Sequence, residues 1–114
     1  MNSLKIKISE KEKEVISKIN KFRKGNIIDE FKYDNIIEFK DLFVDKYSEH
    51  IFYNKKNFFK LSNGKYLIKM PINEFEARFY NREKNITDIL LNDYLNKICI
   101  VEKNNKYLFF FYFI

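Results

Sequence analysis

The chain has 114 residues, of which 46% are hydrophobic and 33% are charged, and its formal net charge is +6 at pH 7. This size and composition predict one globular domain spanning residues 1–114 and not a disordered tail. The sequence has no run of about 18 apolar residues, so it predicts no membrane-spanning helix. A single cysteine excludes an internal disulfide framework, and one cysteine with one histidine is too few ligands for a tetrahedral zinc site.

The first predicted elements are a strand and a helix. Over residues 3–8, apolar side chains alternate with lysines, which is typical of a half-buried strand. Ser9 and Glu12 have the spacing of a capping box, and apolar residues follow at helical spacing. The sequence therefore predicts a helix over about 10–24, with Gly25 as its left-handed stop.

Residues 26–50 are expected to form one or two further helices. Ile27, Ile28 and Phe31 suit a short helix, and a longer apolar stripe starts after Asp34.

A hairpin is the clearest short-range prediction. Asn63-Gly64 separates two alternating runs, 57–62 and 65–70, and Asn-Gly favours a two-residue type I′ turn. That turn pairs Phe59 with Ile68 and Phe58 with Lys69. The solvent face of this hairpin would then carry Lys60, Lys65 and Lys69, with Phe58 among them.

The next segments are expected to be a strand and a helix. Residues 72–82 fit either period, and their alternation favours a strand over a helix. Residues 86–97 have helical spacing that turns Tyr94 inward, with Asn85 or Thr87 as the cap.

The C-terminal segment predicts a second hairpin, with strands at about 98–103 and 106–113 closed by Asn104-Asn105. Its register places the buried, inert Cys99 opposite Phe110. Both faces are apolar, so this hairpin is either buried on both sides or offers a homodimer contact. The predicted class is α+β, a single small domain with a mainly antiparallel sheet, helices packed on it, and the order β-α-α-β-β-β-α-β-β.

The candidate binding residues lie in the basic and aromatic stretch 51–69. Proteins that bind single-stranded nucleic acid combine such charges with rings that stack on bases. An alternative interpretation is a solvated cationic face that protects a sheet edge. The residues that we assign to binding are Lys55, Lys56, Phe58, Lys60, Lys65 and Lys69.

The sequence contains no phosphate-binding glycine loop and no metal-binding or nucleophile motif, so we expect no enzyme, no cofactor and no metal. Residues 1–9 lack the features of a signal peptide, which favours a cytoplasmic protein. The abundance of Lys, Ile, Asn, Phe and Tyr is typical of AT-rich genomes, and short motif-free chains of this kind suit phages and mobile elements.

The resulting hypothesis is a small non-catalytic binding protein that docks on a nucleoprotein or on a nucleic-acid-binding host machine, in the way CRISPR inhibitors do. Three alternatives stay open: a regulator that binds RNA or DNA directly, a homodimeric module joined through the 98–113 hairpin, and a ribonuclease-type toxin. The candidate residues for the toxin are Arg78, Arg82, His50 and Tyr53.

Overall fold

The computed structural model describes residues 4–5, 8–33, 36–37, 51–55, 57–61, 65–103 and 106–112 of the chain. Side chains are described within 8–33, 57–60 and 65–100.

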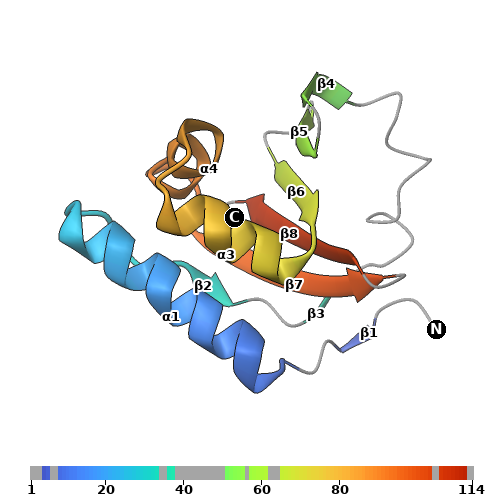
Figure 1. Cartoon of the computed structure of the whole chain (residues 1–114), viewed down its shortest axis with the longest axis horizontal. Helices are drawn as coiled ribbons and strands as arrows, with labels where there is room; N and C mark the ends of the chain where they lie inside the picture. Colours follow the sequence, from blue (N-terminus) through green and yellow to red (C-terminus); the bar gives the residue numbers. More distant parts are fainter. Residues whose placement is uncertain are drawn as a thin grey trace.

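Two sheets and three helices make up the described fold (Figure 1). The larger sheet has six strands in the order β2-β7-β8-β6-β5-β4, and the smaller has β1 and β3. The strands are β1 (Leu4–Lys5), β2 (Lys32–Tyr33), β3 (Ile36–Ile37), β4 (Ile51–Lys55), β5 (Phe58–Leu61), β6 (Tyr66–Met70), β7 (Lys97–Lys103) and β8 (Lys106–Tyr112). The helices are α1 (Glu10–Gly25), α3 (Ile72–Tyr80) and α4 (Lys84–Leu90).

The helices pack on one face of the larger sheet. The core contains Ile68 and Met70 of β6 and Ile98 and Ile100 of β7, whose side chains lie on the same face. Buried residues of all three helices complete this core: Val15, Ile16, Ile19, Phe75, Phe79, Ile86, Ile89 and Leu90. α1 and α3 lie side by side and run in the same direction, so their C-terminal ends share one end of the molecule (Figure 1). No helix in the described part of the chain is long and apolar enough to cross a membrane.

The predicted α+β class is confirmed, but one pair of strands departs from the expected antiparallel arrangement. β2 runs parallel to β7, with Lys32 opposite Lys97. Two hydrogen bonds between the Asn20 side chain of α1 and the Phe31 backbone orient the chain just before β2. Asn20 accepts from the Phe31 amide at 2.8 Å and donates to the Phe31 carbonyl at 3.2 Å. This clamp on α1 guides the chain into β2, which runs alongside β7 as an edge strand of the sheet.

The helix predicted over 10–24 is confirmed as α1, together with its capping box. Ser9 Oγ accepts from the Glu12 amide at 3.1 Å, and Glu12 Oε1 accepts from the Ser9 amide at 3.0 Å. The expected left-handed stop at Gly25 is wrong, because Gly25 is the last helical residue and the positive φ of 61° falls on Ile27.

The short helix expected around Ile27, Ile28 and Phe31 is also wrong. The amide of Ile27 bonds to the Lys24 carbonyl and that of Ile28 to the Arg23 carbonyl, which closes α1 with a Schellman motif. A residue with a positive φ cannot continue a right-handed helix. Residues 28–31 therefore run as a loop into β2. The longer helix expected after Asp34 lies mostly outside the described residues, although Ile36–Ile37 form the short strand β3.

The two predicted hairpins differ in outcome. The C-terminal register is confirmed, with Cys99 opposite Phe110 and Ile100 opposite Phe109. The other hairpin is shifted by one residue, because Phe58 and not Phe59 lies opposite Ile68. The turn predicted at Asn63-Gly64 lies outside the described residues, and the strands on either side of it pair Lys60 with Tyr66. Since a one-residue shift exchanges the faces of a strand, Phe58 joins the core.

Residues 72–80 form a helix, so the preference for a strand is wrong. Phe75 and Phe79 lie four residues apart and are both buried, and their rings are 6.1 Å apart. Pro71 suits this start, because the position before a helix needs no amide donor.

The helix expected over 86–97 is shorter than predicted, since α4 ends at Leu90. The buried Arg23 guanidinium donates hydrogen bonds to the carbonyls of Leu90, Asn92 and Leu95. These carbonyls therefore face Arg23 and not the amides four residues later, as they would in a helix that continued. Asn92 accepts from the Tyr94 amide and forms a turn. Tyr94, expected to face inward, is 80% exposed. The expected cap at Asn85 or Thr87 is wrong too, because α4 begins after Glu83 without a side-chain cap.

Candidate functional site

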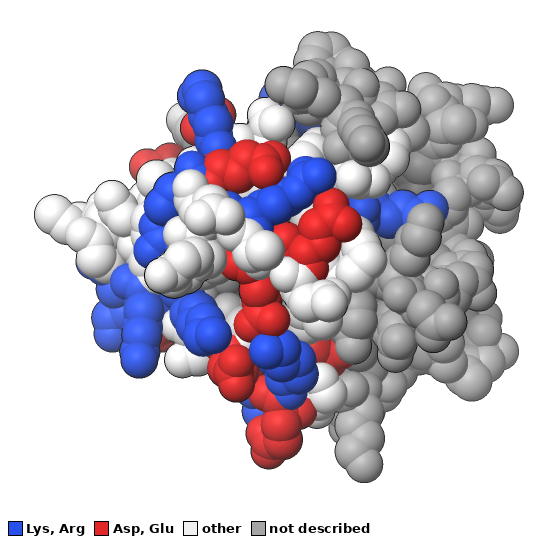
Figure 2. All heavy atoms as spheres, in the orientation of Figure 1, with Lys and Arg blue, Asp and Glu red and all other residues white. Residues whose placement is uncertain are grey.

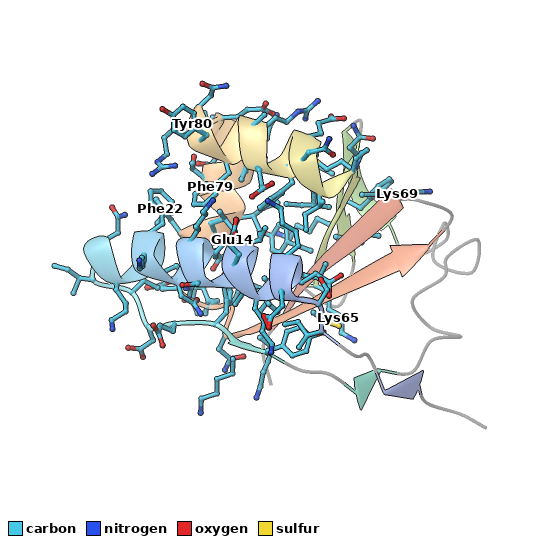
Figure 3. All side chains as sticks on the ribbon, turned by 60° about the horizontal axis from the view of Figure 1, so that its bottom comes forward. Glu14, Phe22, Lys65, Lys69, Phe79 and Tyr80 are labelled. Carbon is cyan, nitrogen blue, oxygen red and sulfur yellow. The ribbon has the colours of Figure 1, made fainter. Side chains whose placement is uncertain are left out.

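The side chains between α1 and α3 line a hollow of about 490 Å³, here named the α1–α3 groove (Figure 3). Its lining residues are Val15, Lys18, Lys21, Phe22, Glu76, Phe79, Tyr80 and Arg82. The α1 residues recur every three or four positions and so share one face of that helix. Two other surface hollows among the described residues, of about 490 Å³ and 560 Å³, are at least as large, so the composition of the α1–α3 groove and not its volume makes it the candidate site.

Aromatic rings form the floor and one end of the groove. Phe22 of α1 and Phe79 of α3 meet edge to face, with their centroids 5.4 Å apart and an interplanar angle of 72°. This contact joins the two helices near their C-terminal ends (Figure 3). Tyr80 follows at the end of α3 and is 83% exposed. The groove therefore combines a packed aromatic floor with a ring that is open to solvent.

Arg82 holds its guanidinium against this aromatic floor. The guanidinium carbon lies 4.6 Å from the ring centroid of Phe22 and 4.7 Å from that of Phe79. Among the described residues, its Nη1 makes one hydrogen bond, to the Phe79 carbonyl at 2.7 Å. These contacts fix the orientation of the planar cation and leave its remaining N–H groups available to a ligand.

The backbone of Arg82 is strained. Its φ of 54° lies in the left-handed region, where L residues with long side chains are uncommon. The Arg82 amide bonds to the Phe79 carbonyl and the Glu83 amide to the Arg78 carbonyl, which is the Schellman pattern. Glycine is the usual residue at this position. Strained non-glycine positions of this kind cluster at functional sites.

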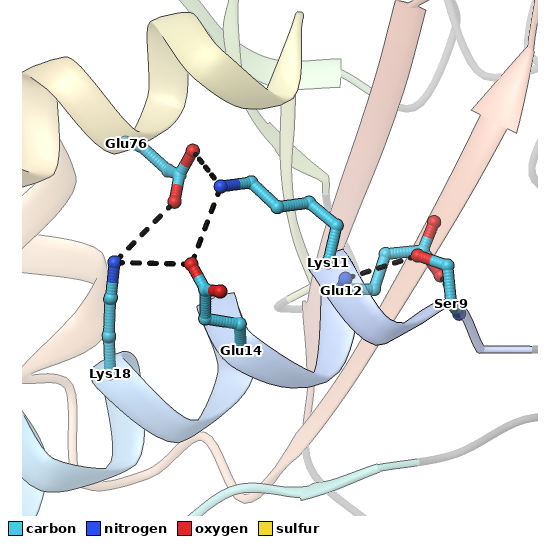
Figure 4. Close-up of polar contacts among 6 residues, drawn as sticks. All are labelled: Ser9, Lys11, Glu12, Glu14, Lys18 and Glu76. Atoms are coloured by element: carbon cyan, nitrogen blue, oxygen red, sulfur yellow. Dashed lines mark hydrogen bonds and ion pairs between the residues drawn. The ribbon is translucent and has the colours of Figure 1, made fainter.

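Four charged residues beside the groove neutralise one another (Figure 4). Glu76 of α3 lies 2.9 Å from the Lys11 ammonium and 3.7 Å from that of Lys18, and Glu14 lies 3.4 Å from each. The hydrogen bonds from Lys18 and then Lys11 lower the pKa of Glu14, and the hydrogen bond to Glu76 raises the pKa of Lys11. Two lysines and two glutamates leave no net charge from this network.

The positive charge of the groove therefore comes from Lys21 and Arg82. Neither residue takes part in an ion pair with any residue that the structure describes. Figure 2 shows Lys and Arg gathered toward the end of the molecule where α1 finishes, and mixed with Asp and Glu toward the centre of the view. An anion approaching this end meets cations that no described carboxylate neutralises.

The structure separates the lysines that the sequence places on one face. Lys60 lies on the core face with Tyr66, 5.5 Å from its ring centroid, in a hollow of about 320 Å³ against α4. Lys69 alternates to the opposite face and is exposed. Lys65 and Lys69 both lie away from the aromatic end of the α1–α3 groove (Figure 3).

The other predicted binding residues have different positions. Phe58 is 3% exposed, and the Arg78 guanidinium carbon lies 5.9 Å from its ring centroid. Lys55 is in β4, where side chains are not described, and Lys56 lies outside the described residues. The structure therefore adds Phe58 to the core, and of the candidates whose side chains it describes, none lines the α1–α3 groove.

Of the residues proposed for a ribonuclease, the two arginines have different surroundings. Arg78 is bound to Glu74 at 3.0 Å and to Glu83 at 3.4 Å, whereas Arg82 lies in the groove. His50 is outside the described residues, and Tyr53 belongs to β4 without a described side chain.

Of the residues that line the groove, the sequence singles out Arg82 alone. A strand over 72–82 would place Phe79 and Tyr80 on opposite faces, and nothing within 10–24 shows which element packs beside Lys21 and Phe22. The available signal was the four-residue spacing of Phe75 and Phe79, which fits a helix.

No known protein family, curated protein or solved structure matches this chain. Within the described residues, no three histidine, cysteine or acidic side chains converge closely enough to hold a metal ion.

Proposed function

We propose that the protein is a non-catalytic binding protein that docks on a nucleoprotein through the α1–α3 groove. The observation that carries this proposal is the pair Lys21 and Arg82, two cations without a described ion-pair partner, beside the exposed ring of Tyr80. Phosphate-rich partners attract such surfaces over long distances, and the net charge of +6 acts in the same direction.

The contacts that Arg78 and Arg82 already make within the chain favour a binding role over a catalytic one. Arg78 is held by two carboxylates, and the Arg82 guanidinium is stacked on two phenyl rings. General acid–base catalysis needs a titratable partner within hydrogen-bond reach. In the described region around the groove, the carboxylates of Glu14 and Glu76 are already bound to Lys11 and Lys18.

The C-terminal hairpin has a structural role that competes with the homodimer alternative. β8 is hydrogen-bonded to β7 on one side and to β6 on the other, so both of its edges are used within the chain. Joining two chains through β8 would require one of these pairings to open. Docking through the groove requires no such rearrangement.

The test is affinity purification of the tagged chain from its host, with and without nuclease treatment. The expected result is a co-purifying nucleoprotein that is retained by the wild type and lost from the double variant Lys21→Gln, Arg82→Gln. The double variant Lys13→Gln, Lys84→Gln is the matched control, because it also removes two positive charges and both lysines are exposed and do not line the groove. Equal recovery by the groove variant and the control would refute docking through this groove.

A further inference from the structure

We infer that the α1–α3 groove binds an unpaired strand of nucleic acid, with Lys21 and Arg82 on its phosphates and Tyr80 stacked on a base. This inference rests on the proposed function and names the part of the nucleoprotein that the groove contacts. It commits the site to a single strand, RNA or DNA, and not to a duplex or to a protein surface.

The charges of the groove are complementary to a phosphodiester backbone. Lys11, Glu14, Lys18 and Glu76 neutralise one another along the middle of the two helices (Figure 4). Lys21 and Arg82 remain as cations at the C-terminal end, one on each side of the groove. A phosphodiester backbone carries one charge per nucleotide, so a strand crossing from α1 to α3 meets both cations.

The exposed ring of Tyr80 favours a single strand over a duplex. Its side chain is open to solvent beside the two cations, while the rings of Phe22 and Phe79 are covered by their mutual contact and by Arg82. Aromatic rings on single-strand-binding proteins stack on bases that are not paired. In a duplex the faces of the bases are already stacked on one another, so Tyr80 has no base to contact.

Arg82 is preorganised for a phosphate. Its stacking on two rings and its hydrogen bond to the Phe79 carbonyl hold the guanidinium plane before any ligand arrives. A preordered arginine loses less side-chain entropy on binding than a free lysine. Its left-handed backbone is better suited to glycine, so an arginine at this position needs another explanation than helix termination.

The test measures binding of the purified full chain to fluorescein-labelled oligonucleotides of about 12 nucleotides by fluorescence anisotropy. The probes are oligo-U RNA, oligo-dT DNA and a duplex of the same length. We expect binding to at least one single-stranded probe at least about 10-fold tighter than to the duplex, and the two single-stranded arms show whether RNA or DNA is preferred.

Substitutions at three residues locate the contact. Tyr80→Ala should weaken single-strand binding about 10-fold, while Tyr80→Phe, which keeps the ring, should bind like the wild type. Lys21→Gln should lower the slope of log affinity against log salt by about 0.7, the value for one phosphate contact on a single strand. Arg82→Gly should also weaken binding, and it keeps the fold because glycine suits the left-handed backbone.

Lys13→Gln removes the same charge from α1 but outside the groove. It should therefore weaken binding much less than Lys21→Gln does. Equal affinity for the duplex, or equal effects of Lys13→Gln and Lys21→Gln, would overturn this inference. If no oligonucleotide binds while the chain still captures a nucleoprotein in a groove-dependent way, the inference fails and the proposed function stands. If groove-dependent capture fails as well, both fall.

Discussion

Arg23 is the residue whose removal tests the described architecture most directly. Its side chain is only 1% exposed, and it extends from the end of α1 into the space between two loops. The guanidinium donates to the carbonyls of Asp29 at 2.7 Å, Leu90 at 2.8 Å, Asn92 at 3.2 Å and Leu95 at 2.8 Å. We therefore expect Arg23→Met to loosen both the 28–31 loop and the 91–96 loop.

The magnitude follows from the carbonyls that lose their donor. The hydrogen bonds to Leu90 and Leu95 are fully buried, and each unsatisfied buried acceptor costs about 1–3 kcal/mol. The carbonyls of Asp29 and Asn92 are partly exposed and can turn to water. Removing a buried charge offsets part of the cost. The expected net loss is about 3 kcal/mol of unfolding free energy.

Arg23 stays positively charged over the pH range of ordinary buffers. Burial lowers the pKa of its guanidinium, and the nearby carboxylates of Asp29 and Asp93 act in the opposite direction. An arginine stays protonated in folded proteins because its ordinary pKa is so high. The loss caused by Arg23→Met should therefore be independent of pH between about pH 5 and pH 9.

The assay is equilibrium urea unfolding followed by circular dichroism, with Lys24→Met as the matched control. Lys24 is the next residue, its side chain is exposed, and its ion pair with Glu30 is long at 3.8 Å, so its loss should cost less than about 0.5 kcal/mol. Arg23→Lys keeps the charge with fewer donors and should fall between them, which preserves the test if Arg23→Met does not fold. Equal losses for Arg23→Met and Lys24→Met would refute the reasoning.

Four further predictions test local features. Ile27→Gly should raise the unfolding free energy by about 1 kcal/mol, because Ile27 has a φ of 61° and is 96% exposed. Gly25→Ala should raise it by about 0.5 kcal/mol, because an added Cβ at this helical position meets no atom within 4 Å. A loss of stability in thermal melts would contradict either prediction. Glu14 has a pKa below its ordinary 4.5, so its stabilising contribution is present above that pH and is lost as the pH falls through the folded value. The difference in melting temperature between the wild type and Glu14→Gln should therefore shrink on acidification, and a constant difference would argue against the ion network. Phe58→Ala should cost about 3–4 kcal/mol in urea unfolding, whereas Lys69→Gln should stay within about 0.5 kcal/mol, and similar values would place Phe58 outside the core.

The sequence predicts best where a local signal decides the structure. Ser9 and Glu12 specify the start of α1 because each satisfies an amide of the other residue. The turn predicted at Asn104-Asn105 specifies the register of the C-terminal hairpin, because a turn of fixed length decides which residues lie opposite each other, and Cys99 lies opposite Phe110 as that turn requires. These contacts lie within one element or between neighbouring strands, so the chain order alone makes them visible.

The sequence predicts poorly where a distant residue decides. α4 ends at Leu90 because the Leu90 carbonyl accepts a hydrogen bond from the guanidinium of Arg23, which lies 67 residues earlier in the chain. The turn at Ile27 defies local preference, because a β-branched residue resists a positive φ. The candidate site depends on both kinds of information: Lys21 and Phe22 follow from a well-predicted helix, but their meeting with Phe79 depends on how α3 packs against it.

A strained residue follows the C-terminal end of both α1 and α3, and substituting it with glycine distinguishes a structural role from a binding role. Ile27 and Arg82 occupy the same position in two Schellman motifs, and each bears a strain of about 1–2 kcal/mol that glycine would avoid. At Arg82, two exposed cation–π contacts of about 0.5–1 kcal/mol each nearly balance that strain. Arg82→Gly should therefore leave the unfolding free energy within about 1 kcal/mol of the wild type, so folding alone gives arginine no clear advantage over glycine there. A loss well above that value would make Arg82 a structural clamp between α1 and α3, whereas unchanged stability with weakened binding would assign its guanidinium to the ligand.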